Sequence, residues 1–571
     1  MGLSASTPWL KYYGSTPASL NYPEKTMYQL LRNTAQKYPD HIAYVFQGKK
    51  TTYAQFMKRI DAAAKGLYTM GLRRGDKITI CMANTPQALD CFYACNRLGV
   101  IPNMIHPLSA PAEIAFYLNF SKSKAILTLD QFYDKVASIL PELENPTQIL
   151  IAKVADELPF PLNFIYPHTK GGKHPLPKNG YALWEHVLCA GTDLIELPPD
   201  VGTATDCGAI LYSGGTTGTT KGIMLSNRNF NALGLQTIAA SGFGSVAGMK
   251  MLSIMPIFHG FGLGIGIHTA LIGGATCYLI PQFSVKIYAD TLLKHKPELI
   301  PGVPTLFEAL LRADALKNSD LSFLKGIFCG GDSLSPELKK KVDVFLKEHN
   351  CAEQIREGYG TTECVTASCL TPKDYARSGS IGVPFPDTFS KIVTPGATAE
   401  LPAGQEGEIC LSGPTVMLGY MDNPEETAQA LRTHDDGQVW LHTGDLGHMD
   451  EEGFVYFHQR LKRMIITSGY NVYPSQLENI IDSHDKVLLS CVIGVKDPYR
   501  VQRIKAYIVP MPGITPDEAL KQELLAYCAQ RIAKYAMPRE IEFRTELPKT
   551  LVGKVAYRVL EEEANAQEDA T

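Results

Sequence analysis

The sequence lacks several features that would point to common classes of protein. Lysine and arginine (54) do not exceed aspartate and glutamate (58), so the net charge is 54 − 58 = −4 and no nucleic-acid partner is expected. The 13 cysteines form no CxxC pair, and no cysteine and histidine have the spacing of a zinc motif. Scattered cysteines in odd number are typical of reduced thiols, which predicts a cytoplasmic protein.

Targeting and membrane segments are also lacking. The first residues, "MGLSASTPWLKYYG", have no uninterrupted apolar core of a secretory signal. Gly2 and Ser6 match the N-myristoylation pattern, but so short a pattern often matches by chance. The stretch from Met251 to Val285 has no acidic residue, Lys or Arg and is long enough to cross a membrane. Because Pro256, His259 and several glycines interrupt it, we expect no transmembrane segment but a buried helix and strand.

What is present favours an α/β protein. A chain of 571 residues is too long for one compact core. Short β-prone runs such as KITICMAN, CGAILYS and KGIFCGG alternate with helix-like stretches such as 53–69 and 337–348. This alternation predicts largely parallel sheets packed with helices. The pattern changes to a small α+β unit near residue 460, so we place a domain boundary between 458 and 463.

One loop is rich in glycine and threonine. In "LYSGGTTGTTKGIML", residues 211–225, nine of fifteen residues are Gly, Thr or Ser. It lies between a strand candidate and a helix candidate (227–240), where open α/β sheets hold ligands. Bare backbone N–H groups, hydroxyls and Lys221 together suit a polyphosphate rather than a flexible linker. It is not a Walker loop, because the two glycine positions and the Lys-Ser/Thr ending do not match.

The loop "YSGGTTGTTKG" resembles the signature loop of the adenylate-forming superfamily, which includes acyl- and aryl-CoA synthetases, peptide-synthetase adenylation domains and firefly-type luciferases. Thr220 stands where that family commonly has Pro. Six further stretches resemble family motifs in the family order: MPIFHGFG (255–262), FCGGDSLS (328–335), EGYGTTE (357–363), HTGDLG (442–447), QRLKRMIITSGYNVYPSQLE (459–478) and LPKTLVGKVAYR (547–558). With the loop they are spread from residue 212 to residue 558, over most of the chain.

The resemblance implies a fold and a reaction. The expected fold is α/β, with a large multi-subdomain N-terminal domain (1–459), a hinge (460–462, with Lys462 as the hinge residue) and a small mobile α+β C-terminal domain (463–571). The implied reaction joins a carboxylate to the α-phosphate of ATP, expels pyrophosphate, and passes the acyl group to coenzyme A. Two anions must meet in it, so the site has to supply cations.

The resemblance also assigns roles to residues. Lys554 would bridge the carboxylate and the α-phosphate, Thr362 would donate to the α-phosphate, and Glu363 would hold Mg²⁺. Lys221 would hold the leaving phosphates, and His259 would gate the acyl pocket. The nucleotide-binding set implied is Ser213, Gly214, Gly215, Thr216, Thr217, Gly218, Thr219, Lys221, Gly331, Asp332, Glu357, Gly358, Tyr359, Gly360, Thr361, Thr362, Asp445, Arg460 and Lys554. Tyr359 would stack on adenine, and Asp445 and Arg460 would contact the ribose.

The residues that the pocket region lacks limit which carboxylic acid can be the substrate. No Asp or Glu lies in 251–285 to pair with a substrate amine, so an amino acid is disfavoured as the substrate. All three Trp lie elsewhere in the sequence, so none of them is expected to narrow the pocket. Gly260, Gly262, Gly264 and Gly266 are read as volume for an acyl chain. A medium- or long-chain fatty acid is therefore favoured. The expected acyl pocket contains Phe258, His259, Gly262 and Gly330.

Coenzyme A is the expected acceptor, and the residues expected to contact it are Ser468, Gly469 and Tyr470. Three alternatives stay open: an aryl-acid CoA ligase, an acyl-AMP ligase that loads a carrier protein, and a non-catalytic acyl- or nucleotide-binding protein. The expected partners are the carboxylic acid, ATP and CoA, with a homodimer and a downstream acyltransferase left open.

Overall fold

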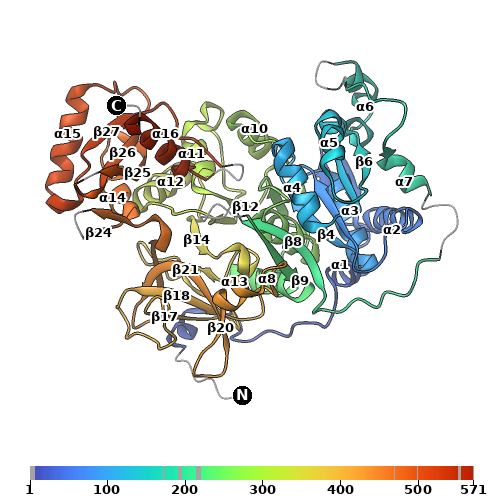
Figure 1. Ribbon diagram of the computed structural model, residues 1–571, viewed down its shortest axis with the longest axis horizontal. Helices are drawn as coiled ribbons and strands as arrows, with labels where there is room; N and C mark the ends of the chain where they lie inside the picture. The colour runs from blue at the N-terminus through green and yellow to red at the C-terminus, as the bar shows by residue number, and fades with distance from the viewer. Residues whose placement is uncertain are drawn as a thin grey trace.

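The computed structural model describes residues 7–169, 172, 174–190, 196–213, 220–467, 470–497, 499–550 and 554–569. Four β-sheets form this part of the chain. Figure 1 shows most strands of one sheet, from residues 77–226, on the right and a sheet from residues 389–460 below. The C-terminal sheet, from residues 465–543, lies with its helices on the left. Helices fill the space between, which confirms the predicted α/β fold with a large N-terminal and a small C-terminal part.

The first sheet is mainly parallel and has the order β19-β9-β8-β4-β3-β5-β6-β7. Only its β8–β9 and β9–β19 pairs are antiparallel. Its strands are β3 (Lys77–Cys81), β4 (Ile101–Ile105), β5 (Ala125–Leu129), β6 (Gln148–Ala152), β7 (Ala182–Leu183), β8 (Cys207–Ser213), β9 (Lys221–Ser226) and β19 (Gly419–Tyr420).

The second sheet has the order β16-β15-β14-β13-β12-β10-β11-β1-β2, with a parallel centre from β14 to β1 and antiparallel pairs at both ends. Its strands are β1 (Ile42–Phe46), β2 (Lys49–Thr52), β10 (Lys250–Ser253), β11 (Thr276–Leu279), β12 (Leu299–Gly302), β13 (Gly326–Cys329), β14 (Arg356–Tyr359), β15 (Cys369–Leu370) and β16 (Val383–Pro384).

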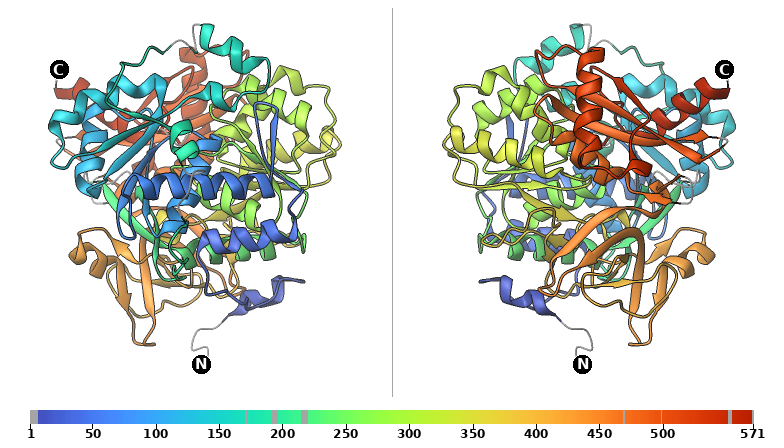
Figure 2. Two further views of the ribbon diagram at one scale, coloured as in Figure 1. Left: turned by 90° about the vertical axis from the view of Figure 1, so that its right-hand side faces the viewer. Right: turned by 90° about the vertical axis from the view of Figure 1, so that its left-hand side faces the viewer.

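Helices between these two sheets join them into one hydrophobic core. α3 (Pro86–Leu98) packs on β3 and β4 of the first sheet, and α2 (Tyr53–Thr69) packs on α3 and on β1 and β2 of the second. Figure 2 shows α1 and α2, in blue, between the cyan and the yellow-green strands. α2 begins where Thr52 and Gln55 form a capping box, which satisfies N–H groups at the helix start. The remaining larger helices here are α1 (Met27–Lys37), α4 (Pro111–Ser121), α8 (Asn227–Ser241), α10 (Val285–His295), α11 (Pro304–Arg312) and α12 (Pro336–Glu348).

The uncharged stretch Met251–Val285 forms part of this core, as predicted. It contains most of β10, the π-helical segment η6 (Phe261–Thr269), α9 (Ala270–Ile272) and β11, and their side chains are almost all buried. Across the described part of the chain, none of the helices has both the length and the hydrophobicity that a membrane span needs.

The third and fourth sheets follow in sequence. The third contains β17 (Phe389–Val393), β18 (Gly407–Ser412), β20 (Leu431–Thr433), β21 (Val439–Met449) and β22 (Val455–Arg460). The fourth contains β23 (Ile465–Thr467), β24 (Tyr470–Val472), β25 (Val487–Asp497), β26 (Val501–Pro510) and β27 (Glu540–Phe543), with α14 (Pro474–Asp482), α15 (Glu518–Ala529) and α16 (Tyr557–Asp569). This unit has hydrophobic clusters of its own.

One local expectation was wrong. The glycine-threonine loop was placed between a strand and a helix, but a second strand, β9, lies between the loop and α8. β8 and β9 are antiparallel, and Ser213 is paired with Lys221 where the loop leaves and re-enters the sheet. β8 and β9 are therefore an antiparallel pair that is consecutive in the sequence, and residues 214–219 between them lie outside the described residues. Only after β9 does Ser226 cap α8, by accepting a hydrogen bond from the Asn229 N–H.

Candidate active site

Motifs far apart in the sequence meet because parallel strands end at one edge of a sheet. β13 and β14 are parallel neighbours, with Phe328 opposite Arg356 and Cys329 opposite Glu357. The FCGGDSLS and EGYGTTE motifs begin in these strands and continue past their carboxyl ends. This edge is where open α/β sheets generally bind ligands.

Asp445 is held by two neighbours. The Tyr359 hydroxyl donates to Asp445 Oδ2 at 2.7 Å, and Arg460 Nε lies 3.1 Å from Oδ1. Asp445 and Arg460 are opposite each other on β21 and β22, so the sheet register sets this ion pair. Burial raises the pKa of Asp445, against the lowering effects of Arg460 and Tyr359. Its Oδ1 is buried and receives no hydrogen bond from the described residues, although Arg460 is within ion-pair distance.

A second cluster surrounds Glu363 and Lys221. Tyr420, on β19, donates its hydroxyl proton to Glu363 Oε1 at 3.0 Å, and the ammonium of Lys221 lies 4.7 Å from the centre of the Tyr420 ring. Lys221 Nζ also lies 2.8 Å from Glu426 Oε2. β19 pairs with β9, and the Met417 N–H donates to the Glu363 carbonyl at 2.8 Å. The β9–β19 pairing thus brings the lysine and the acid of two separate motifs to one side chain.

Lys554 reaches this region from the C-terminal unit. Its Cε is 3.7 Å from where a Cβ on Gly331 would lie, so the lysine crosses directly over the strand end at Gly331. Burial lowers the pKa of Lys554, and the charge of Arg460 lowers it further. Asp332 opposes this most strongly, and Asp445 and Glu363 act in the same direction as Asp332. The electrostatic partners of Lys554 are therefore members of the same predicted site.

His259 and Phe258 lie beside the cluster. His259 Nδ1 accepts a 3.1 Å hydrogen bond from the Phe261 N–H, and burial together with the charge of Lys554 lowers the pKa of His259 to about 3. The imidazole is therefore neutral at physiological pH. The Phe258 ring packs edge-on against His106 at 4.4 Å between ring centres.

A narrow cavity of about 40 Å³ lies behind this edge. Side chains from η6, β13, β14 and β15 surround it; its lining residues are Thr237, Phe261, Ile265, Phe328, Cys329, Gly330, Gly331, Gly358, Thr366, Ala367, Cys369, Leu370 and Phe385. Of the four residues expected in an acyl pocket, Gly330 is among them, while Phe258, His259 and Gly262 are not. Ligand pockets usually enclose roughly 300–1,000 Å³, so a long acyl chain would have to displace some of these side chains.

Gly260 and the three glycines of η6 were read as volume for a chain, and the structure corrects this for three of the four. A Cβ on Gly260 would lie 1.7 Å from the Val365 carbonyl oxygen, and one on Gly262 would lie 2.0 Å from the Pro256 oxygen. On Gly264 it would meet the Leu233 side chain at 2.7 Å. Real Cβ atoms do not approach so closely. These three glycines allow backbone to pack tightly against backbone and side chains, and only Gly266 has ordinary space around it.

The remaining predicted residues differ in how far their side chains are buried. Thr361 is buried, while Thr362 and Asp332 are partly or wholly accessible at the strand ends; Glu357 is buried, which raises its pKa to about 7. A Cβ on Gly360 would be 2.3 Å from the Thr366 oxygen, so this glycine too serves close packing.

Tyr470 is exposed and stacks on Tyr535, with 4.5 Å between ring centres. Gly214, Gly215, Thr216, Thr217, Gly218, Thr219, Ser468 and Gly469 lie outside the described residues, as does the side chain of Lys462.

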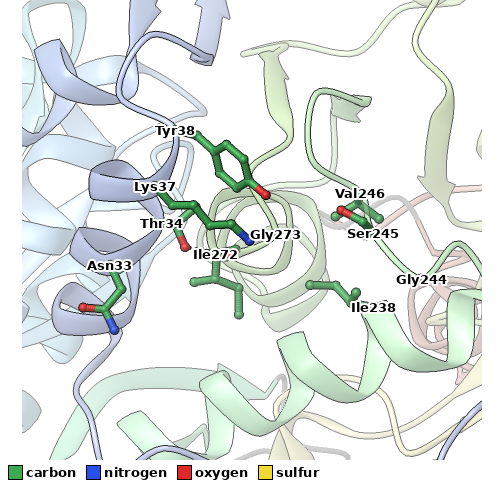
Figure 3. A pocket seen from close by; sticks show the side chains of 10 residues that line it. All are labelled: Asn33, Thr34, Lys37, Tyr38, Ile238, Gly244, Ser245, Val246, Ile272 and Gly273. Carbon is green, nitrogen blue, oxygen red and sulfur yellow. Dashed lines mark hydrogen bonds between the residues drawn. The ribbon is translucent and has the colours of Figure 1, made fainter.

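Sequence reasoning missed Tyr420 and Glu426, which contact Glu363 and Lys221. Neither stands in a motif-like stretch, and the β9–β19 pairing that brings them close joins segments about 200 residues apart. It also missed the cavity-lining Phe261, Ile265 and Ala367. A larger hollow of about 270 Å³ lies elsewhere, between α1, the end of α8 and the loop after it, as Figure 3 shows for Lys37, Tyr38 and Ile238. None of its lining residues belongs to the site.

Fold and site define a two-part α/β protein, in which a large N-terminal part and a small C-terminal part contribute to one cluster of charged side chains. The model of the AMP-binding enzyme family matches residues 31–421, and that of the AMP-binding enzyme C-terminal domain matches residues 476–554. The chain belongs to the AMP-binding enzyme family, within the adenylate-forming superfamily, as its motifs predicted.

Individual relatives agree. A long-chain-fatty-acid–CoA ligase of Bacillus subtilis is 36% identical over 98% of this chain and 99% of that protein. Another long-chain-fatty-acid–CoA ligase, of Salmonella typhimurium, is 31% identical over 98% of this chain and 99% of that protein. Among solved structures, ATP-bound MatB from Rhodopseudomonas palustris is 26% identical with a TM-score of 0.78, covering 94% of this chain and 99% of that one. The anthranilate CoA ligase AuaEII, at 24% identity, TM-score 0.83 and coverage of 96% and 99%, shares the fold.

Proposed function

We propose that this protein is an AMP-forming acid–thiol ligase that activates a long-chain fatty acid with ATP and transfers the acyl group to coenzyme A. The observation that carries the proposal is the similarity, over nearly the full chain, to proteins named long-chain-fatty-acid–CoA ligase. The convergence of Lys554, Asp445 and Glu363 on one strand edge supports the same chemistry.

In the first step, a carboxylate oxygen attacks the α-phosphorus of ATP, and the bond to the bridging oxygen of pyrophosphate breaks. Lys554 places a cation between the two negative groups, which lowers the repulsion as they bond. Asp445 Oδ1, a buried acceptor without a hydrogen-bond donor in the described chain, is suited to accept from a ribose hydroxyl. Tyr359 and Arg460 fix the orientation of that carboxylate.

The side-chain oxygens near the proposed phosphate site are suited to bind a divalent cation. Glu363 offers carboxylate oxygens, hard ligands that Mg²⁺ prefers, and Tyr420 orients one of them. Mg²⁺, when bound, supplies positive charge to the phosphate oxygens. Lys221 and the glycine-threonine loop are proposed to hold the leaving pyrophosphate. Because Lys221 is paired with Glu426, ATP binding would exchange that carboxylate for phosphate.

In the second step, the coenzyme A sulfur attacks the acyl carbon, the thiol proton passes to solvent, and the bond from the acyl carbon to the AMP phosphate oxygen breaks, which releases acyl-CoA and AMP. Lys554 has to leave the site after the first step and before this one. We propose that the C-terminal domain, 463–571, turns about the hinge at 460–462 and brings Ser468, Gly469 and Tyr470 toward the thiol. The cavity lined by Phe261, Ile265 and Ala367 is proposed as the start of the acyl-chain site.

The test is a direct assay. The purified protein is incubated with ATP and Mg²⁺ and a panel of C2–C18 fatty acids and aryl acids, with and without CoA, and AMP and thioesters are followed by mass spectrometry. We expect AMP and long-chain acyl-CoA in equal amounts, and no product after EDTA is added. Acyl-AMP that is not converted to a thioester would favour carrier loading, preference for aryl acids would overturn the fatty-acid assignment, and ADP would reject adenylation.

A further inference from the structure

The third sheet brings together a cysteine and two histidines, away from the strand edge that holds the site. Cys410 on β18 and His442 on β21 are directly opposite each other in the antiparallel pair. His434 follows β20 and is held in the tight turn toward β21, where its N–H donates to the Gln438 oxygen at 3.0 Å. The Cys410 sulfur and one ring nitrogen of each histidine all lie within 4.8 Å of one another.

The three side chains are buried but incompletely hydrogen-bonded. Exposure is 0% for Cys410, 4% for His434 and 9% for His442. The two Nε2 atoms face each other at 3.0 Å. His434 Nδ1 is buried, and among the described residues it has no hydrogen-bond partner. The two facing Nε2 atoms must share either a proton or a cation, and the Cys410 sulfur beside them favours a cation.

A carboxylate behind His442 fixes the tautomer of that ring. His442 Nδ1 is 2.8 Å from Glu408 Oε2, and Glu408 Oε1 accepts from the Gly444 N–H at 2.9 Å. Burial acts against ionisation, but these two hydrogen bonds keep the pKa of Glu408 below its ordinary value. The ionised carboxylate accepts a hydrogen bond from the Nδ1–H of His442, so the Nε2 of His442 carries a lone pair, which is directed at His434. Carboxylate–histidine pairs of this kind commonly orient metal ligands.

We propose that Cys410, His434 and His442 bind one Zn²⁺ ion. A thiolate and two imidazoles are ligands that zinc prefers, with Zn–N of about 2.0–2.1 Å and Zn–S of about 2.3 Å. Two nitrogens on one tetrahedral ion are about 3.3 Å apart by those distances, so the observed 3.0 Å requires only a small rotation of one ring. Water would provide the fourth ligand.

The charges around the site balance this ion. Zn²⁺ with one thiolate carries a net charge of +1, and Glu408 behind His442 compensates it. Burial lowers the pKa of His434, so its imidazole is neutral and free to bind. Lys391 and Arg432 also act on Cys410, and Asp436 accepts from Lys391 at 3.1 Å, which offsets that lysine. Burial raises the pKa of the Cys410 thiol, so metal binding must release its proton.

The zinc motifs sought in the sequence could not reveal this site. Its ligands are separated by 434 − 410 = 24 and 442 − 434 = 8 residues, and only strand pairing aligns them. A bound ion would join β18, the β20–β21 turn and β21, and its ligand His442 stands three residues before Asp445 on β21. We infer that the ion steadies the strand carrying Asp445. The inference does not depend on which acid the enzyme uses.

The test begins with metal content. The full-length protein is stripped with a chelator, loaded with Zn²⁺, passed through a desalting column and analysed by inductively coupled plasma mass spectrometry. We expect about one Zn²⁺ per chain, lost in Cys410→Ser and in His434→Gln. Matched controls are Cys351→Ser, another buried cysteine, and His448→Gln, because His448 and His458 also face each other at 2.9 Å but without a thiol. Both controls should keep the ion.

Two further measurements do not depend on the folding of variants. Co²⁺ in the unmodified protein should give a thiolate-to-metal charge-transfer band and the visible spectrum of a tetrahedral ion. Zinc affinity should rise about tenfold per pH unit near neutrality, because one thiol proton is released. The proposal is overturned if the unmodified protein binds no Zn²⁺, if binding persists in Cys410→Ser, or if Co²⁺ shows no thiolate band.

Discussion

Tyr359 and Asp445 are joined by a 2.7 Å hydrogen bond, although they belong to different sheets and are 86 residues apart. The tyrosine was expected to offer its face to adenine, and its hydroxyl has a second role, because it orients the carboxylate proposed for the ribose. Tyr359 is thus the link between the EGYGTTE motif on β14 and the HTGD motif on β21. Its two parts are proposed to contact neighbouring portions of one nucleotide.

Tyr359→Phe separates these two roles. The ring remains for stacking, but Asp445 Oδ2 loses its donor in a buried position. A hydrogen bond to a charged group contributes about 1.5–3 kcal/mol, so we expect ATP to bind at least about tenfold more weakly. Isothermal titration calorimetry with a non-hydrolysable ATP analogue measures this. The exposed Tyr499→Phe is the control, and unchanged affinity in Tyr359→Phe would show that the hydroxyl does not position the ribose site.

Lys554→Ala tests the cation that crosses over Gly331. Removal of a donor that stabilises developing charge typically slows a reaction by about 10²–10³. We expect pyrophosphate release to fall by that factor while ATP affinity changes little. Lys534→Ala, on the surface of the same unit, should leave the rate unchanged. Near-normal pyrophosphate release from Lys554→Ala would refute the role.

The pH dependence follows from the lowered pKa of Lys554. Lysine supports the reaction only when protonated, so a lowered pKa means that activity is lost as pH rises, beginning below the range where an ordinary lysine titrates. We expect kcat/KM, which reports the free enzyme, to fall on this alkaline limb. Lys554→Arg keeps its charge to much higher pH, so its limb should move upward or disappear. An identical limb in both proteins would assign it to another group.

Tyr420→Phe tests the support of the proposed metal ligand. The variant removes the 3.0 Å hydrogen bond to Glu363 but keeps the ring beside Lys221. We expect the Mg²⁺ concentration for half-maximal activity to rise about tenfold, with the maximal rate little changed at saturating Mg²⁺. A Mg²⁺ titration of AMP formation measures this. Loss of maximal rate without a shift in the Mg²⁺ requirement would instead place Tyr420 in the chemical step.

The sequence was sufficient for features that local patterns determine. Helix α2 runs over the predicted 53–69, and the uncharged stretch at 251–285 is buried, because periodicity and charge report burial directly. The motifs indicated the family and contain most residues of the proposed site. Strand β9 was missed because the run KGIMLS follows the glycine-threonine loop directly, and its pairing with β8 is a tertiary property. Tyr420 and the Cys410–His442 pair depend on strand register in the same way.

The glycines of η6 show most clearly why volume cannot be read from composition. A small side chain means either open space or close contact, and only the surrounding atoms distinguish the two. Gly262 and Gly266 form a matched pair in one helix. Alanine at 262 would place a methyl 2.0 Å from the Pro256 oxygen and 2.4 Å from the Met255 oxygen, whereas at 266 the nearest atom is 3.8 Å away.

We therefore expect Gly262→Ala to destabilise the protein by at least about 1–3 kcal/mol, since backbone would have to move. Gly266→Ala should be neutral or slightly stabilising, because alanine favours a helix over glycine by about 0.5–1 kcal/mol. Thermal unfolding of both variants measures the difference, and acyl-chain preference is assayed beside it. If Gly262 lined the chain instead, its alanine variant would fold normally and shift preference to shorter acids, so the pair decides between packing and tunnel volume at this position.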